Sequence, residues 1–435
     1  MSSSEQRGRF LVPDAHRPGW RYVPDGVLRW DARGQITGFE EQAAWSSAPP
    51  SHPEVVWMPG FVDTHLHYPQ TRIIGSATGP LLDWLERSTF TEEARFRDRG
   101  HAQAVAERFC LSMLRQGTTC ASIYSSSHPG ATEVLFEGLA RHGMRAEVGL
   151  TLMDQGAPPE LLLEAEAALD ACEALIERWH LTEEGRLRFC ITPRFALSCS
   201  SKLMRGAGAL AVKHRLLMQT HISENEAEIE ATVSLHPTAA HYLGVYHDHG
   251  LLESRSLFAH CIWLKDSEWA LLKSLDGAVS HCPDSNFFLG SGQMSLKEAQ
   301  HWGVRLGMGT DVGAGRSFSL RRSAARAYDA SRISRSVTSA GELLWLATRG
   351  GAFALGREQE LGAFEVGMGA DVVGIRPPPE LAYLEPARFE RLTAEEQAEA
   401  LCAGLVFCED WDGVEQVRIA GQVRWSRNTS THTTS

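Results

Sequence analysis

Two histidines one residue apart follow an apolar run and carry the strongest chemical signal in the chain. His65 and His67 lie in Asp63-Thr64-His65-Leu66-His67, directly after the run 55–62. In a β-strand, side chains at i and i+2 project from the same face. The spacing therefore predicts that both imidazoles leave one strand end together, as half of a zinc site. Taken alone, the motif also fits a surface pair of histidines.

Other metal-ligand residue types stand at the ends of three further apolar runs. His221 and His260 each end such a run, and Asp311 follows the run 304–310. Residues at the same relative position of separate strands are expected to converge on one metal. Imidazole and carboxylate ligands with one open position are the composition of a hydrolytic zinc site. Such a metal lowers the pKa of its bound water to about 7.

Three of these residues keep alternative roles at this stage. Glu224 lies three residues after His221; it is expected in the first turn of a helix, where it shuttles protons or only favours the helix dipole. Asp311 is a ligand, the base that takes the proton of the water, both of these, or a turn residue. His260 is a fourth imidazole, a donor that orients the water, or a buried core histidine.

Arg194 and Phe195 follow the fourth predicted strand. A guanidinium and an aromatic ring suit a flat, carbonyl-bearing ring, because Arg can donate to the oxygen and Phe can stack. The alternative is a surface ion pair beside a packed Phe. No lysine stands at this strand end to bridge a second metal, so one metal is expected. His281 and Asn286 are expected to be structural or to support the site.

Apolar segments that alternate with helical patterns must position these side chains. Eight strands that alternate with helices predict a parallel (β/α)8 barrel, whose functional residues gather at the C-terminal strand ends. An open doubly wound sheet is the alternative, and no Gly-x-Gly-x-x-Gly supports it. The strands are expected at 59–66, 118–124, 145–152, 187–193, 216–222, 256–261, 277–281 and 304–309.

Both ends of the chain instead contain short alternating segments with turn signals. They predict one small β-sandwich domain built from the two termini. The boundaries expected are 1–57 for its N-terminal part, 58–360 for the barrel, and 361–435 for its C-terminal part with a polar tail.

Composition limits the partners. The net charge of −12 and the lack of a basic block argue against a nucleic-acid polymer. No apolar stretch approaches the length of a membrane helix, and the first residues have no signal-peptide core. The nine cysteines are scattered without a Cys-x-x-Cys pair. A cytoplasmic protein with no membrane partner is therefore expected.

Longer motifs resemble the amidohydrolase superfamily, and within it the guanine deaminases. The segments 192–195 and 219–225 are specific to guanine deaminases when they occur together, whereas 281–286 and 309–313 are shared across the superfamily. The segment 59–70 is similar to the first-strand motif, and the resemblance covers nearly the whole chain. The chain departs from the family pattern in loops near the site, at Ser88, Thr91 and Ala314.

The resemblance implies guanine deamination to xanthine and ammonia with one zinc per chain, iron not being excluded. It implies these metal ligands: His65, His67, His221 and Asp311. It implies that Glu224 and Asp311 transfer protons and that His260 binds the hydroxide. The purine would contact Gln70, Arg194, Phe195, Glu224 and His260. The partner is then a small purine, and a homodimer is compatible with this hypothesis.

Two other functions remain open. One is deamination or dechlorination of another azaheterocycle such as a triazine, a pterin or an oxidised guanine. The other is a non-catalytic barrel scaffold, which predicts the loss of at least one ligand, yet all the ligand residues are present.

Overall fold

The computed structural model describes residues 4–42, 54–76, 79–252, 255–408 and 410–427. The chain divides into two compact units. The first comprises 1–63, 112–120 and 319–435, and the second comprises 64–111 and 121–318. The domain boundaries expected after residues 57 and 360 stay a prediction.

Eight strands form one parallel sheet of the TIM-barrel type, which confirms the predicted fold class. Its order is β11-β12-β13-β14-β5-β6-β7-β9, and a parallel bridge between Ile191 and Met218 joins the two outer strands. A short pair, β8 (Thr151–Leu152) and β10 (Thr192–Pro193), continues β7 and β9. The barrel strands are β5 (Phe61–His67), β6 (Thr118–Tyr124), β7 (Arg145–Gly149), β9 (Leu187–Phe189), β11 (Met218–Ile222), β12 (Ser256–His260), β13 (Ala278–His281) and β14 (Arg305–Met308).

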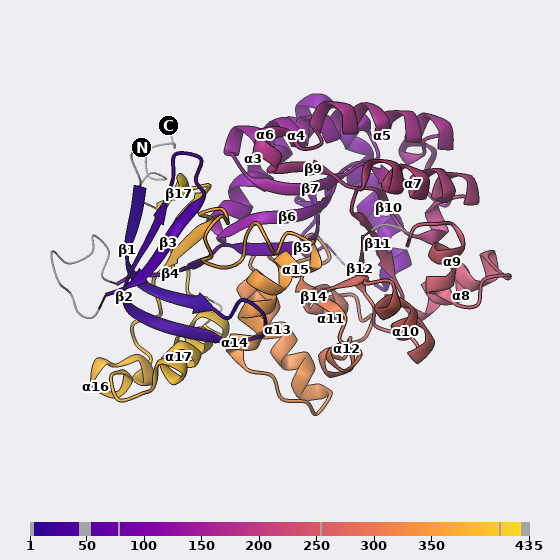
Figure 1. The fold of residues 1–435 in the computed structure, drawn as a ribbon. Coiled ribbons are helices and arrows are strands. Elements are labelled where there is room, and N and C mark those ends of the chain that lie inside the picture. Colours follow the sequence, from indigo (N-terminus) through magenta and orange to yellow (C-terminus); the bar gives the residue numbers. More distant parts are fainter. Residues whose placement is uncertain (1–3, 43–53, 77–78, 253–254, 409, 428–435) are drawn as a thin grey trace. The chain divides into compact units, whose positions relative to one another are not determined.

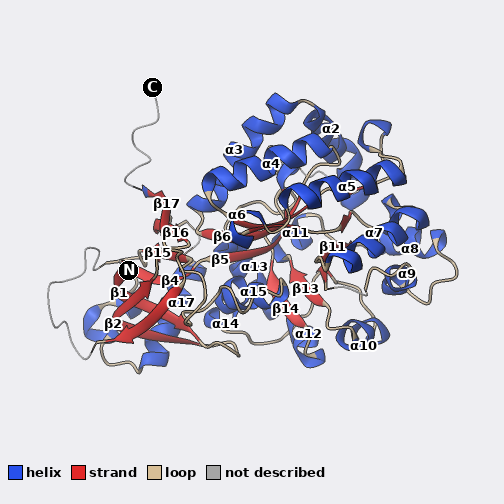
Figure 2. Cartoon of the chain, turned by 45° about the horizontal axis from the view of Figure 1, so that its top comes forward, coloured by secondary structure: helices blue, strands red, loops and turns tan. Residues whose placement is uncertain are grey.

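Burial explains why these short segments form strands. Every residue of β5, β6 and β12 is buried, as expected where helices cover a parallel sheet. Figure 2 shows α4, α5 and α7 on the outside of the strands. The helices of this part are α1 (Leu81–Trp84), α2 (Phe90–Glu93), α3 (Arg99–Arg115), α4 (Pro129–His142), α5 (Ala165–Trp179), α6 (Thr182–Gly185), α7 (Ser201–His214), α8 (Glu226–Leu235), α9 (Tyr242–Asp248), α10 (Asp266–Ser274), α11 (Pro283–Phe288) and α12 (Leu296–Trp302).

The sequence pattern over 224–246 predicts one long helix, and this prediction is wrong. The segment forms α8 and α9, and α8 begins at Glu226 after the N-cap Asn225. The Asn225 side chain accepts from the backbone N–H of Ala227, and Glu228 completes a capping box. Pro237 follows the end of α8 and cannot continue its hydrogen bonds.

The first unit contains a seven-stranded mixed sheet built from both ends of the chain, as Figure 1 shows by its indigo and yellow strands. Its order is β17-β16-β15-β4-β1-β2-β3, in which β1 and β4 are parallel. Its apolar side chains include Phe10, Trp30 and Phe364. The strands are β1 (Ser4–Pro13), β2 (Trp20–Trp30), β3 (Ile36–Glu41), β4 (Val56–Pro59), β15 (Val372–Ile375), β16 (Val414–Ile419) and β17 (Gln422–Ser426).

The same unit contains helices that the sequence patterns did not predict. They are α13 (Leu320–Ile333), α14 (Ala340–Trp345), α15 (Gly351–Ala354), α16 (Pro386–Phe389) and α17 (Ala394–Phe407). Within the described ranges, no helix has the length and apolar character that crossing a bilayer requires. The tail predicted after 426 lies outside the described residues from 428 onward.

Candidate active site

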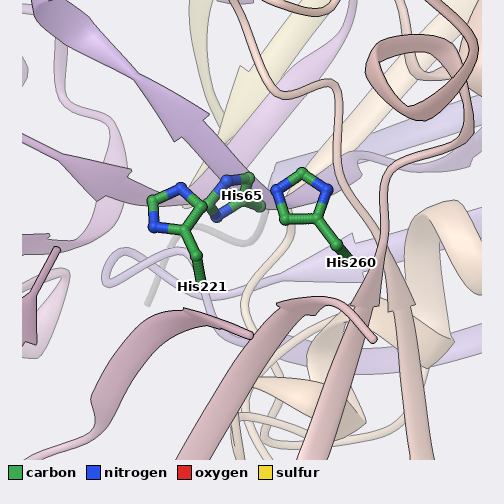
Figure 3. A group of neighbouring side chains, drawn as sticks. All are labelled: His65, His221 and His260. Carbon is green, nitrogen blue, oxygen red and sulfur yellow. The ribbon is translucent and has the colours of Figure 1, made fainter. Parts of the chain in front are cut away.

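The C-terminal ends of the barrel strands bring the five predicted metal-type side chains together. His65 and His67 end β5, His221 lies on β11, His260 ends β12, and Asp311 lies three residues past β14. Because the strands are parallel, their C-terminal ends meet on one face of the barrel. Figure 3 shows the rings of His65, His221 and His260 gathered from three strands.

The distances between the donor atoms fit a tetrahedral ion. The Nε2 atoms of His67 and His221 are 3.2 Å apart. Asp311 Oδ1 lies 3.3 Å from His65 Nε2 and 3.4 Å from His67 Nε2. Two ligands at zinc bond lengths and tetrahedral angles are separated by roughly 3.3 Å. These four residues therefore fit one zinc ion in both chemistry and spacing.

His260 is a further donor close to this group. Its ring nitrogen lies within 4.8 Å of ligand atoms of His65 and His221. Its Nε2 is 3.9 Å from Asp311 Oδ2 but 3.3 Å from Glu224 Oε2. His260 Nδ1 lies 2.8 Å from Asn286 Oδ1 and donates to it, which leaves Nε2 with its lone pair toward Glu224. His260 thus lies between the four proposed ligands (His65, His67, His221 and Asp311) and the carboxyl group of Glu224.

Backbone groups orient His221. Its Nδ1–H donates to the carbonyl oxygen of Arg194 at 2.6 Å, so its Nε2 keeps the lone pair that a metal needs. The Tyr246 hydroxyl donates to the carbonyl of His221 at 2.8 Å. Burial lowers the pKa of His221 well below its ordinary value, and burial lowers that of His67 to about 4. Both imidazoles are therefore neutral at physiological pH, the state that binds metal.

Asp311 is the anionic member of this group of side chains. Burial alone would raise the pKa of its carboxyl group, but its interactions with the His65 and His67 rings outweigh the effect of burial. The pKa of Asp311 is held well below its usual range. The carboxylate form supplies an anionic ligand or a base.

Glu224 lies before α8 rather than in its first turn, which corrects the expected position. Asn225 and Glu228 already cap the helix, so Glu224 is not needed there. Its side chain is buried, and the Ser291 hydroxyl donates to its Oε1 at 3.3 Å. Burial, with the Asp311 and Glu228 charges, raises the pKa of Glu224 well above its ordinary value. A carboxyl group in this environment retains a proton that it can donate.

A second group of side chains forms what we call the recognition wall, Gln70, Arg194 and Phe195. Both polar members are buried, and so is Phe195. Gln70 follows β5, and Arg194 and Phe195 follow β10. The Gln70 Oε1 accepts from the backbone N–H of Gly313 at 3.1 Å. Arg194 is not a surface ion-pair residue, which removes that alternative.

The recognition wall lines one cavity together with His67, His221, His260 and Asp311. The empty space among its side chains, including the open solvent at its mouth, is about 400 Å³. Apolar residues of α1 (Leu81–Trp84) and the π-helical turn η2 (Leu85–Thr89) cover one side. The lining is His67, Gln70, Leu81, Trp84, Leu85, Arg194, Phe195, His221, Glu224, Glu228, His260, Leu289, Asp311 and Ala314.

Sequence reasoning missed two buried carboxylates at this site. Glu93 pairs with Arg194, its Oε2 lying 2.6 Å from Nη1. Glu228 accepts from the backbone N–H of Glu224 at 2.9 Å and from the Tyr242 hydroxyl at 2.6 Å. The capping-box pattern Asn225-x-x-Glu228 was a signal for Glu228, whereas nothing in the spacing marks Glu93. Asn286 supports His260, as expected for a supporting residue, and His281 is buried at the end of β13.

Comparisons with known proteins identify the family of the chain. The amidohydrolase family matches residues 56–399. The chain belongs to this family. It is 37% identical to guanine deaminase of Escherichia coli over 375 residues, 84% of each chain. Among solved structures, guanine deaminase from Bradyrhizobium japonicum is similar with a TM-score of 0.89 and 31% identity, over 98% of this chain and 100% of that one.

A third relative carries a ligand in its structure. Guanine deaminase from C. acetobutylicum, solved with guanine bound in its active site, is similar with a TM-score of 0.86 and 28% identity. The match covers 97% of this chain and 100% of that one. As a member of the amidohydrolase family, this chain is a hydrolase with a histidine-rich metal site.

Proposed function

We propose that the protein is a guanine deaminase, which converts guanine and water to xanthine and ammonia. One observation carries the proposal: a single cavity is lined both by Glu224, His260 and Asp311 and by the recognition wall. Proton-transfer groups and groups that fit an oxo-purine thus face the same space. Relatives named guanine deaminase at 34–38% identity support the substrate.

The proposal includes one metal ion per chain. Three imidazoles and one carboxylate would hold it, and this nitrogen and oxygen donor set suits zinc, with iron as the other outcome of a metal assay. When bound, the metal supplies activated water at neutral pH. The ligands would be His65, His67, His221 and Asp311.

The residues around the ion divide the proton transfers. Glu224 donates a proton to the ring nitrogen beside the amino-bearing carbon, which makes that carbon electrophilic. Asp311 takes a proton from the attacking water, and His260 Nε2 accepts a hydrogen bond that holds the water in place. The amino group leaves as ammonia after it receives a proton. The proton that Asp311 takes goes to the amino group, and the proton of the added hydroxyl returns to Glu224. One water molecule is added and one ammonia molecule leaves, so the atoms balance.

The recognition wall orients the base. Arg194 donates to the ring oxygen, Phe195 stacks on the ring, and Gln70 contributes its amide. Arg194 also presents its backbone carbonyl to His221. One residue therefore links the position of the purine to the orientation of a metal ligand.

Ultraviolet absorbance of guanine-to-xanthine conversion tests the proposal. The purified holoenzyme should convert guanine, and a chelated sample should not until zinc is restored. A panel with a pterin, a triazine and an oxidised guanine runs in parallel through ammonia release. Turnover of one of these rings without turnover of guanine would refute the assignment and leave a hydrolase of another azaheterocycle.

A further inference from the structure

Glu93 holds the two polar side chains of the recognition wall. It lies at the end of the short helix α2 (Phe90–Glu93) and is 4% exposed. Its Oε2 accepts from Arg194 Nη1 at 2.6 Å, and its Oε1 accepts from Arg194 Nη2 at 3.2 Å. The same Oε1 accepts from Gln70 Nε2 at 3.1 Å. One carboxylate thus fixes both side chains.

Glu93 does so without lining the cavity itself. Arg194 and Gln70 are among the described residues of the cavity lining, and Glu93 is not. The guanidinium lies 5.4 Å from the centre of the Phe90 ring, and its Nη1 is 3.8 Å from Met153 Sδ. Neither Phe90 nor Met153 lines the cavity, so these contacts hold the guanidinium from outside the cavity lining.

The charge of Glu93 decides what Arg194 can recognise. A guanidinium has five N–H donors, of which two serve Glu93, so donors remain for a ligand. The pair carries one positive and one negative charge, so the wall is neutral as a unit. A buried and unpaired guanidinium would instead attract anions strongly, because little water screens its charge.

We infer that Glu93 is a specificity-determining residue, which aims Arg194 and cancels its charge so that the site takes neutral oxo-purines and discriminates against anionic ones. This inference rests on the proposed function, since it concerns the ring that the same wall receives. Glu93 acts through Arg194 and Gln70 and is a positioning residue rather than a catalytic one.

Two purines that the reaction cannot deaminate serve as probes. Hypoxanthine is neutral at neutral pH and has the ring oxygen, and urate is an anion under the same conditions. Each is measured as a competitive inhibitor of guanine turnover by the zinc-loaded enzyme. The ratio of their inhibition constants reports the preference for neutral over anionic rings, whatever the turnover rate of a variant.

The decisive comparison is Glu93→Gln with Glu92→Gln. The first variant keeps the shape of the side chain but leaves the positive charge of Arg194 without its counter-charge. Urate should therefore gain affinity relative to hypoxanthine by at least about tenfold, as expected when a desolvated charge loses its partner. Glu92 lies next to it on α2 and is also buried, but it contacts Arg72, Arg95 and His101 instead. Glu92→Gln should leave the ratio unchanged.

The Glu93→Asp variant tests the charge of residue 93 separately from its positioning of Arg194. It also tests the inference if Glu93→Gln does not fold. It keeps the negative charge but is one methylene too short to reach Arg194 and Gln70 together. The ratio should stay as in the parent enzyme while KM for guanine rises and kcat holds. A fall in kcat with KM unchanged, or an unchanged ratio in folded Glu93→Gln, would overturn the inference. Neither result touches the proposed function, which fails only if the parent enzyme does not deaminate guanine.

Discussion

Replacing Glu224 by glutamine removes its transferable proton but keeps its other contacts. In the structure the Ser291 hydroxyl donates to Glu224 Oε1 at 3.3 Å, and Oε2 faces His260 Nε2 at 3.3 Å. Because His260 Nδ1 donates to Asn286, His260 Nε2 accepts. A glutamine can accept from Ser291 through its oxygen and donate to His260 through its amide. Glu224→Gln should therefore fold and pack as the parent does, but it cannot transfer a proton.

The expected loss follows from general acid–base catalysis. Removing a positioned acid costs about 10²–10⁴ in rate, or about 2.7–5.5 kcal/mol of transition-state stabilisation. The loss should appear in kcat with guanine, while KM changes little because the hydrogen bonds to the residue persist. Thermal midpoint and metal content should match the parent, since Glu224 lies outside the proposed ligand set.

The assay is steady-state guanine turnover at equal metal loading, checked by elemental analysis of each sample. Ser291→Ala is the matched control, since it removes one neutral hydrogen bond to Glu224 and keeps the proton; it should cost about tenfold at most. Near-parental turnover by metal-loaded Glu224→Gln would show that Glu224 is not the proton donor. Loss of metal in that variant would instead place Glu224 among the ligands.

Three further predictions concern the metal, the wall and the packing beneath them. Elemental analysis should find about one transition metal per chain, and a second one needed for turnover would refute the mononuclear site. Arg194→Ala should remove a charge-assisted bond of about 1.5–3 kcal/mol from guanine turnover and leave an aminopurine without the ring oxygen less affected; an equal effect on both would remove the reason for naming guanine. That variant should also lose stability, about 3–5 kcal/mol in chemical unfolding, because Glu93 is left buried without its cationic partner. Gly309→Ala would place a Cβ 2.8 Å from the Cβ of His65. The variant should therefore lose about 1–3 kcal/mol of stability and bind less metal. Normal zinc content in that variant would contradict the tight packing.

The barrel and the placement of its metal-type residues were predictable because both depend on local pattern. A short apolar run marks a buried parallel strand, and the predicted run 118–124 coincides with β6 (Thr118–Tyr124). The two-residue period of a strand puts His65 and His67 on one face. Parallel strands then bring distant runs to a common edge without any further information. Their roles as ligands still await the metal assay.

The helical segment after His221 differs from the one that its sequence pattern predicts. Apolar residues recur through 224–246, but Pro237 interrupts them and the structure has two helices, α8 and α9. The capping box of Asn225 and Glu228 places the helix start at Glu226. This start leaves Glu224 in the segment between strand and helix, where its carboxyl group faces His260 instead of the helix dipole. A local error of a few residues thus changed the physical argument for the role of Glu224.

The recognition wall depends on information of another kind. Glu93 and Arg194 are 101 residues apart in sequence, and neither follows a spacing rule that could pair them. Only burial forces the pairing, since a charged side chain inside the fold must find its opposite. The side chains that would hold a metal lie at strand ends, so each can be predicted from its own segment of the sequence. The side chains that would select the substrate ring are instead positioned by contacts between segments far apart in the sequence. Two members of the family can therefore share every ligand motif and still bind different rings, and the residues that hold the wall from behind, such as Glu93, are where such a difference would arise.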